Sequence, residues 1–142
     1  MKDSPETVHQ GGCLCGAVRY RVTGAPRWVA HCHCESCRKA SGSAVVTWAG
    51  YTRESFEVAA GRPVRFASSP GVVRSFCPRC GSPLTYEAER FAGEVHVTVG
   101  SLDEPAGFAP TAHVWTSERV AWLHIADDLP RHPEFGASGD GG

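Results

Sequence analysis

The chain has 142 residues, enough for one domain with its own hydrophobic core. Hydrophobic residues make up 42% and charged residues 20%, and the formal net charge of −1 argues against a protein that binds the nucleic-acid backbone. No stretch approaches the roughly 18 consecutive apolar residues of a membrane-spanning helix, and "MKDSPETVHQ" lacks the apolar core of a secretory signal. We therefore expect a cytoplasmic protein without a membrane or nucleic-acid partner.

Short alternating apolar runs, separated by glycine and proline, predict a mainly β fold. The alternation is clearest in "GAVRYRV", where Val18, Tyr20 and Val22 alternate with arginines, as in a half-buried strand. Similar patterns follow along the chain. Strands are predicted over residues 16–22, 43–51, 56–61, 63–68, 72–76, 83–89, 94–100 and 111–115.

Two segments favour a helix. Residues 35–42, "ESCRKASG", predict a short helix with Gly42 as its C-cap. Residues 117–124, "SERVAWLH", begin with a serine that suits a helix N-cap, and they fit a loop equally well. The predicted organisation is a flexible N-terminus over 1–10, one zinc-binding domain over 11–132, and a disordered tail over 133–142.

Seven cysteines are the most informative feature of the composition. Thiols stay reduced in the cytoplasm, so a disulfide framework is not expected there. An odd number of cysteines also cannot close into disulfides without a remainder. We therefore interpret the cysteines as metal ligands or catalytic groups.

The turn "FCPRCGS" has the form of a zinc knuckle, in which Cys77 and Cys80 bind the same metal. A closed site needs two more ligands, and Cys34 with Cys37 would complete a zinc ribbon. The gap between the two pairs is far longer than the roughly 15–20 residues of a compact ribbon. A ribbon would also leave three cysteines without a role.

The alternative partner for the knuckle is the C-x-C pair in "GGCLCGA", whose side chains share one face of an extended segment. This division uses all seven cysteines, as a set of four and a set of three. Four thiolates are typical of a closed structural zinc, and three leave the open position of a catalytic zinc. We expect two zinc ions per chain, one structural at Cys13, Cys15, Cys77 and Cys80, and one catalytic at Cys32, Cys34 and Cys37.

Proton-transfer candidates surround the set of three in "HCHCESC". His31 and His33 would point to the face of an extended segment opposite Cys32 and Cys34, which disfavours them as direct ligands. His33 is kept as a candidate catalytic residue, with a merely supporting or exposed histidine as the alternative. Glu35 fits a solvated carboxylate at the start of the helix better than a catalytic one.

Charged and aromatic residues near the three cysteines have two interpretations. Arg38 and Lys39 either steer a carboxylate-bearing thiol such as glutathione or form the polar face of the short helix. Trp48, Trp115 and Trp122 are expected in the hydrophobic core rather than in a binding pocket.

The motifs "GGCLCGAVRY", "CHCESCRKASGS", "RSFCPRCGSPL" and "HVWTSERVAWLHIADDLP" together resemble the glutathione-dependent formaldehyde-activating enzyme family, which includes centromere protein V. The resemblance covers most of residues 11–130. It implies a β-tent (Mss4-like) fold of antiparallel sheets around a structural zinc, and the same division of the cysteines into four and three. The family's name-giving reaction joins formaldehyde to glutathione as S-hydroxymethylglutathione, formally a carbon–sulfur lyase run in reverse.

The leading hypothesis is therefore a zinc-dependent carbon–sulfur lyase that acts on a small thiol adduct. Its partners would be a thiol such as glutathione and formaldehyde or a related carbonyl compound. The alternative is a non-catalytic zinc module that binds a protein or a nucleic acid, against which the near-neutral charge argues. Zinc buffering or redox sensing by the three-cysteine set is a further alternative.

Overall fold

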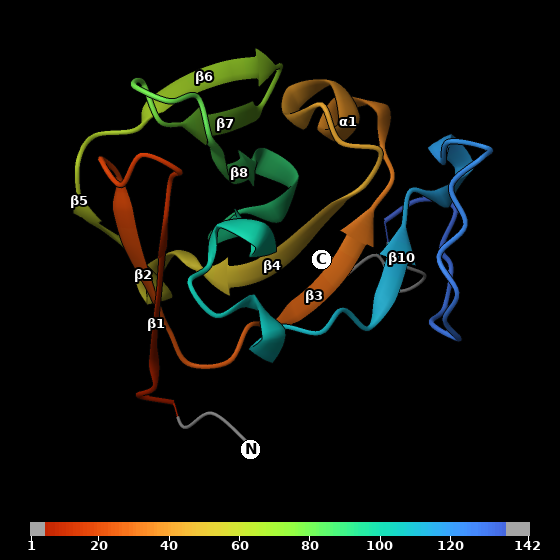
Figure 1. Ribbon diagram of the computed structural model, residues 1–142, viewed down its shortest axis with the longest axis horizontal. Helices are drawn as coiled ribbons and strands as arrows, with labels where there is room; N and C mark the ends of the chain where they lie inside the picture. The colour runs from red at the N-terminus through yellow and green to blue at the C-terminus, as the bar shows by residue number, and fades with distance from the viewer. Residues whose placement is uncertain (1–4, 136–142) are drawn as a thin grey trace.

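The computed structural model describes residues 5–135, which form two β-sheets and one α-helix (Figure 1). The smaller sheet has the order β1-β2-β5, with β1 (Val8–Gly12), β2 (Arg19–Thr23) and β5 (Phe56–Ala60). The larger sheet has the order β10-β3-β4-β9-β8-β7-β6. Its strands are β3 (Trp28–Cys32), β4 (Val46–Thr52), β6 (Val64–Ser69), β7 (Val72–Phe76), β8 (Pro83–Ala88), β9 (Glu94–Thr98) and β10 (Ala112–Val114).

All strand pairs are antiparallel except β10, which runs parallel to β3 at one edge of the larger sheet. The predicted mainly β fold is confirmed, and each predicted strand segment contains a strand. Two strands were not predicted. β1 contains two glycines and polar residues, and β3, "WVAHC", buries side chains on both faces and so lacks a simple alternation.

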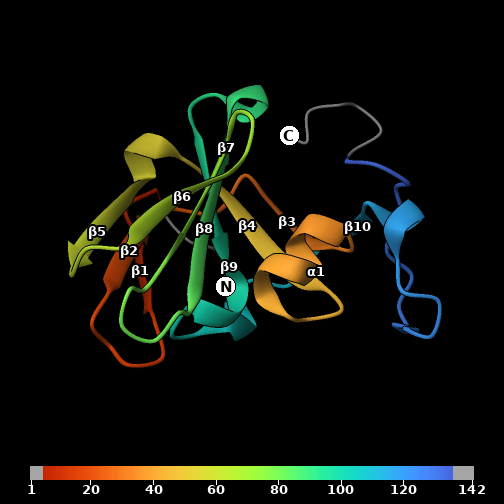
Figure 2. The ribbon, with the colours of Figure 1, turned by 90° about the horizontal axis from the view of Figure 1, so that it is seen from above.

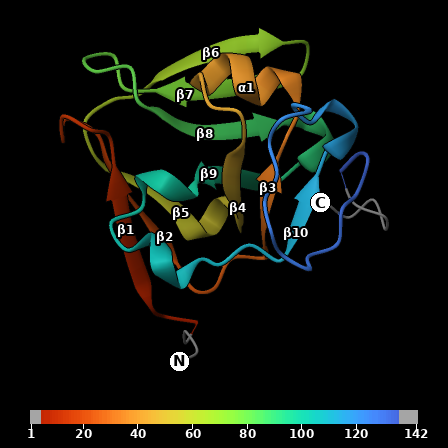
Figure 3. The ribbon, with the colours of Figure 1, turned by 45° about the vertical axis from the view of Figure 1, so that its right-hand side comes forward.

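The predicted short helix is confirmed as α1 (Glu35–Ser41). At its N-terminus the Cys34 sulfur accepts the N–H of Cys37, and Gly42 closes it in the left-handed conformation (φ 77°). In Figures 1 and 3, α1 lies at the same end of the molecule as β6 and β7. Elsewhere single turns of 3₁₀ helix connect the strands, at Arg53–Ser55, Glu89–Phe91, Val99–Ser101, Pro105–Gly107 and Thr116–Glu118.

The helix considered over 117–124 is wrong, and the loop alternative is correct. Only the single turn Thr116–Glu118 forms there. The Ser117 hydroxyl donates to the carbonyl of Pro133 instead of capping a helix, and Arg119 Nη1 donates to three backbone carbonyls of the following loop. These contacts hold an irregular loop because side-chain donors satisfy its backbone.

Strand β1 begins at Val8, ahead of the domain start that we propose at residue 11. At the other end, Trp115 N donates to Glu134 O, so the described chain stays paired with the body as far as residue 134. Residues 136–142 of the proposed tail lie outside the described residues. None of the described helices has the length and apolarity needed to cross a bilayer.

The larger sheet separates two clusters of buried side chains. One face packs against the smaller sheet, which lies at one end of the molecule in Figure 2, and includes Tyr20 and Tyr51. Both hydroxyls are satisfied, by Ser101 Oγ (2.6 Å) and by the carbonyl of Gly24 (3.1 Å). The second cluster lies on the opposite face. It comprises Ala30, Cys32, Cys37, Val46, Trp48 and Val114.

Glu87 on β8 should make the free energy of unfolding depend on pH. Burial alone would raise the pKa of this carboxyl, but hydrogen bonds from Arg65 and Arg53 outweigh burial and lower the pKa. Its stabilising effect should therefore be complete above the unfolded pKa of about 4.5 and be lost as the pH falls through the lower folded value. Glu87→Gln should reduce the free energy of unfolding by about 1 kcal/mol at neutral pH, measured by urea denaturation.

The matched control is Glu57→Gln, because the ion pair of Glu57 with Arg21 is exposed and should contribute little. The wild-type and Glu87→Gln curves should converge in acid, where Glu87 is protonated. Equal losses in both variants, or a difference that persists in acid, would contradict the expectation.

Candidate active site and metal centres

Four cysteines from two distant loops meet at one end of the larger sheet. Cys13 and Cys15 follow β1, Cys77 and Cys80 lie in the turn between β7 and β8, and their sulfur atoms all lie within 4.8 Å of one another. The N–H of Leu14 also donates to Ser82 Oγ (3.0 Å) and joins the two loops. The structure therefore brings together the four cysteines that the spacing assigned to one site.

Backbone N–H groups surround these sulfurs. Cys13 Sγ accepts from Val18 N (3.2 Å), and Cys77 Sγ accepts from the N–H groups of Arg79 and Cys80. Hydrogen bonding to the Ser82 side chain is the main cause that lowers the pKa of Cys80 to about 5. Such donors stabilise thiolates, so the set suits a thiophilic metal ion in a closed tetrahedral site.

The other three cysteines lie where β3 passes into α1. Cys32 ends the strand, Cys34 caps the helix and Cys37 lies in its first turn, and the three sulfurs lie within 4.8 Å of one another. Cys37 Sγ is 3.7 Å from Cys32 Sγ and 3.7 Å from Arg74 Nη2.

Hydrogen bonds from Cys32 and Cys34, with a further contribution from Arg74, lower the pKa of Cys37 to about 2. The pKa of Cys32 is raised by the same thiol cluster, first by its hydrogen bond to Cys34. The three thiols therefore lose their protons as one cluster, and Arg74 stabilises its negative charge. Three converging sulfurs beside a guanidinium group fit a metal ion that keeps one position for another ligand.

The three cysteines open onto a cavity of about 500 Å³. This volume lies in the usual range for small-molecule sites. The second buried cluster and the neighbouring strands form its floor, and its charged lining residues are two arginines and two glutamates, Glu89 and Glu118. Besides the cysteines, the principal lining side chains are Trp28, Trp48, Arg74, Tyr86, Arg90, Phe91, His96, Trp115 and Phe135.

His31 and His33 lie on the other face of β3, as the alternation predicted. His33 lines a second cavity of about 390 Å³, and its Nε2 is 2.9 Å from Nδ1 of His113, whose Nε2 contacts Asp127 (2.9 Å). Burial lowers the pKa of His33 to about 4, so the ring is neutral at pH 7. His31 Nδ1 pairs with Thr47 Oγ1 instead (2.8 Å).

The residues after the three cysteines do not line the larger cavity. Glu35 and Lys39 form an exposed pair (3.8 Å), which agrees with the interpretation of Lys39 as part of a polar helix face. Arginines from other elements, Arg74 on β7 and Arg90 after β8, face the cavity in their place. In "VVRSF" the alternation marked a strand, but no local pattern shows that Arg74 reaches Cys37 from across the sheet.

The three tryptophans that we expected in the hydrophobic core have different environments in the structure. Trp48 is buried as expected, but it also lines the cavity. Trp115 lines the cavity too, with its backbone in the left-handed region (φ 57°), a strained conformation for a bulky residue. The expectation for Trp122 is wrong, because it lies in the irregular loop after Thr116–Glu118 and is 72% exposed.

Comparisons with known proteins place this geometry in a family. The profile described as "Glutathione-dependent formaldehyde-activating enzyme" matches residues 8–118, which contain all seven cysteines. A Halomonas elongata protein named "Putative glutathione-dependent formaldehyde-activating enzyme" is 30% identical over 131 aligned residues, covering 82% of this chain and 80% of that protein.

The crystal structure of a Rhodobacter sphaeroides protein matches the fold with a TM-score of 0.56 and 18% identity. The match covers 86% of this chain and 98% of the other. The fold, the two converging sets of cysteines and the family profile agree. The chain belongs to the glutathione-dependent formaldehyde-activating enzyme family.

Proposed function

We propose that the protein is a zinc-dependent enzyme of the carbon–sulfur lyase type that acts on a small thiol adduct resembling S-hydroxymethylglutathione. One observation carries the proposal. Three sulfurs open onto a cavity of about 500 Å³, while the other four cysteines form a separate cluster. The family and the printed name of the Halomonas relative support a reaction between glutathione and formaldehyde.

In the proposed reaction the thiol sulfur forms a bond to the carbonyl carbon, and the thiol proton passes to the carbonyl oxygen. The reverse reaction breaks the same carbon–sulfur bond. Cys32, Cys34 and Cys37 would hold one zinc ion, and the other four cysteines a second, structural one. A zinc ion held there would act as a Lewis acid that favours the thiolate form of a bound thiol or polarises an aldehyde oxygen.

Other side chains of the cavity suit substrate binding. Arg74 and Arg90 offer guanidinium groups to the carboxylates of a thiol such as glutathione. We retain His33 as a candidate for proton transfer on the chemistry of its imidazole, although its hydrogen bond to His113 assigns it to the smaller cavity.

Zinc content and formaldehyde exchange together test the proposal. The purified protein should contain about two zinc ions per chain. In exchange NMR, the protein should accelerate the interconversion of formaldehyde and its glutathione adduct above the spontaneous rate. Unchanged exchange across glutathione and other small thiols, with both zinc ions bound, would refute the lyase function.

Arg74→Gln is expected to weaken use of a carboxylate-bearing thiol. Loss of the guanidinium beside Cys37 should reduce kcat/KM with glutathione about tenfold, mainly by raising KM, because one charged contact is removed. The control is Lys39→Gln, whose side chain is exposed and outside the cavity. Equal effects of the two variants would contradict a role for Arg74 in binding.

The alternative, a non-catalytic zinc module, is favoured by one feature. Leu14, between Cys13 and Cys15, is 90% exposed and would suit contact with a partner. A single exposed apolar side chain is common on soluble proteins, whereas a large cavity beside three thiols is not explained by a partner at Leu14. The exchange experiment separates the two functions.

A further inference from the structure

The end of the cavity farthest along β3 from the three cysteines is lined by aromatic rings. Trp28 and Cys32 are the two ends of β3 and face the same side, about 13 Å apart along the strand. The Trp28 ring meets His96 edge-on, with ring centres 4.6 Å apart, and Phe135 at 5.4 Å. The Phe91 ring contacts both of these rings, with its centre 5.1 Å from that of His96 and 4.9 Å from that of Phe135.

The register of the sheet builds this arrangement. Trp28, Gly50, His96 and Tyr86 are paired in sequence across the neighbouring strands β3, β4, β9 and β8. A Cβ atom at Gly50 would lie only 2.3 Å from the Trp28 indole, so glycine allows the indole to lie against the sheet. Tyr86 stacks on His96 with ring centres 5.5 Å apart and planes inclined by 21°.

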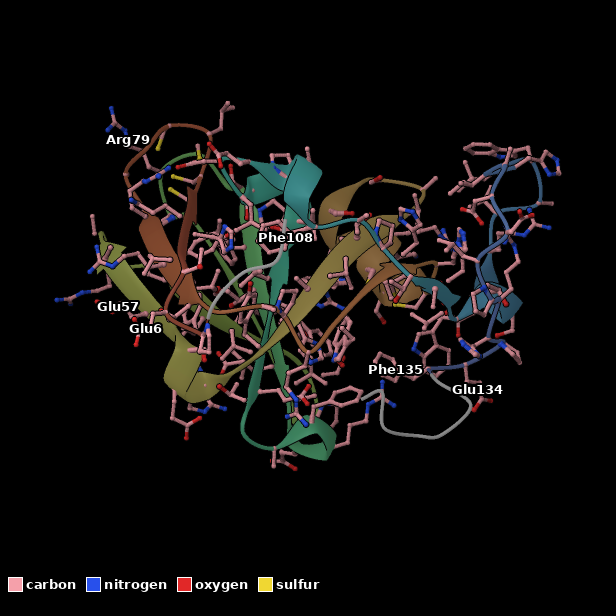
Figure 4. The ribbon with its side chains drawn as sticks, turned by 90° about the horizontal axis from the view of Figure 1, so that it is seen from below. Glu6, Glu57, Arg79, Phe108, Glu134 and Phe135 are labelled. Carbon is pink, nitrogen blue, oxygen red and sulfur yellow. The ribbon has the colours of Figure 1, made fainter. Side chains whose placement is uncertain are left out.

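The C-terminal segment supplies the last wall. Phe135 lies where this segment returns to the body of the molecule, next to Glu134 (Figure 4). The carbonyl of Glu134 accepts the N–H of Trp115 (2.8 Å), which ties the segment to the cavity rim. We call Trp28, Tyr86, Phe91, His96 and Phe135 the aromatic box.

The charged side chains beside the aromatic box determine which kind of ligand it can bind. The Arg74 guanidinium lies 4.9 Å from the centre of the Tyr86 ring, and that of Arg90 lies 4.8 Å from Phe91 and 5.7 Å from Trp115. Glu89 and Glu118 also line the cavity, but the charges that lie over these rings are the two guanidinium groups, which would repel a cationic ligand, the usual guest of an aromatic cage. The guanidinium groups favour instead a neutral ring on a molecule that also carries a negative group.

His96 adds one polar atom to the aromatic box. Its Nε2 lies 2.9 Å from the buried carboxylate of Glu94, which Arg27 also contacts (3.1 Å). The hydrogen bond from His96 is the main cause that lowers the pKa of Glu94, so Glu94 is ionised and Nε2 carries the proton. This contact fixes the orientation of the His96 ring as one wall of the aromatic box.

We propose that the adduct carries an aromatic ring, which the aromatic box binds while the sulfur-bearing carbon lies at the three cysteines and a carboxylate lies near Arg74 and Arg90. This inference rests on the proposed function and narrows its substrate to a ring-bearing thiol adduct. The ring belongs to either the aldehyde or the thiol. In both cases one carbon–sulfur bond forms and the thiol proton moves to the carbonyl oxygen, so no other reactant is needed.

Exchange NMR with three substrate pairs distinguishes these sources. The pairs are glutathione with formaldehyde, glutathione with para-nitrobenzaldehyde, and formaldehyde with para-(mercaptomethyl)benzoate. At least one ring-bearing pair should exceed the formaldehyde–glutathione pair in kcat/KM by about tenfold, the size expected from burying one ring. The faster of the two ring-bearing pairs identifies which partner brings the ring.

Phe135→Ala is the decisive variant, since Phe135 lies on the cavity rim rather than in a strand. It should reduce kcat/KM for the ring-bearing pair about tenfold and leave the formaldehyde–glutathione pair within about twofold. Phe66→Ala is the matched control, because Phe66 is 57% exposed on β6 and outside the cavity. A second readout is binding of unreactive para-nitrobenzoate, followed by quenching of tryptophan fluorescence, which Phe135→Ala should weaken.

The outcomes separate this inference from the proposed function. If formaldehyde and glutathione exchange but the ring-bearing pairs are no faster and Phe135→Ala affects all pairs equally, the aromatic-ring inference is overturned and the lyase function stands. If no pair exchanges but para-nitrobenzoate binds in a Phe135-dependent way, the ring site stands and the lyase function falls. If neither exchange nor binding occurs, both fall.

Discussion

Replacing Cys37 by serine should reduce the exchange of formaldehyde with its thiol adduct to the spontaneous rate while leaving the protein folded. Cys37 carries the lowered pKa of its cluster, and a serine hydroxyl does not ionise to replace that thiolate as a ligand. The helix should survive, because the N–H of residue 37 still donates to the Cys34 sulfur. Zinc content should fall from about two ions per chain to about one.

Cys37→Asp provides the matched control, since a carboxylate oxygen is also a zinc ligand. It should keep more zinc than Cys37→Ser and a reduced but measurable exchange rate. Full turnover by Cys37→Ser on every active substrate would refute the proposed mechanism. Circular dichroism and urea denaturation of both variants show whether the fold is retained.

Cys77→Ser should damage folding itself. Its sulfur is fully buried, accepts two backbone N–H groups and lies among the cysteines that join the loop after β1 to the turn after β7. A structural zinc contributes its binding energy to folding, so the loss should exceed about 4 kcal/mol in the free energy of unfolding, or leave the protein insoluble. Urea denaturation with zinc analysis measures both effects.

Two comparisons test this explanation. Removal of zinc from the wild type by a strong chelator should reproduce the destabilisation, and Cys37→Ser should be far more stable than Cys77→Ser. Similar stability of the two serine variants would contradict separate structural and catalytic roles for the two clusters.

The division of the cysteines could be predicted because it depends on short spacings. The pairs Cys13–Cys15 and Cys77–Cys80, and the set around Cys34, each lie within a few residues, and local backbone geometry aims their sulfurs. Only the pairing of distant groups required an argument from number and chemistry. The strands with alternating side chains were predictable for the same local reason.

The walls of the cavity could not be predicted in this way. Arg74, His96 and Phe135 line the same cavity as Cys37 because of the strand order β9-β8-β7 and the path of the C-terminal segment. These are non-local properties, and each of the three residues has an ordinary local context in the sequence. The family resemblance implied the metal ligands but no substrate-binding residue.

The alternation along β3 bears on which mutations this protein can tolerate. Cys32 faces the larger cavity, and His31 and His33 face the other side of the sheet. A deletion of one residue between Trp28 and Cys32 would shift the strand by one position and exchange thiols for imidazoles on both faces. A change in the length of this strand should therefore be more damaging than a conservative substitution at Val29 or Ala30, because it moves every later side chain to the wrong face.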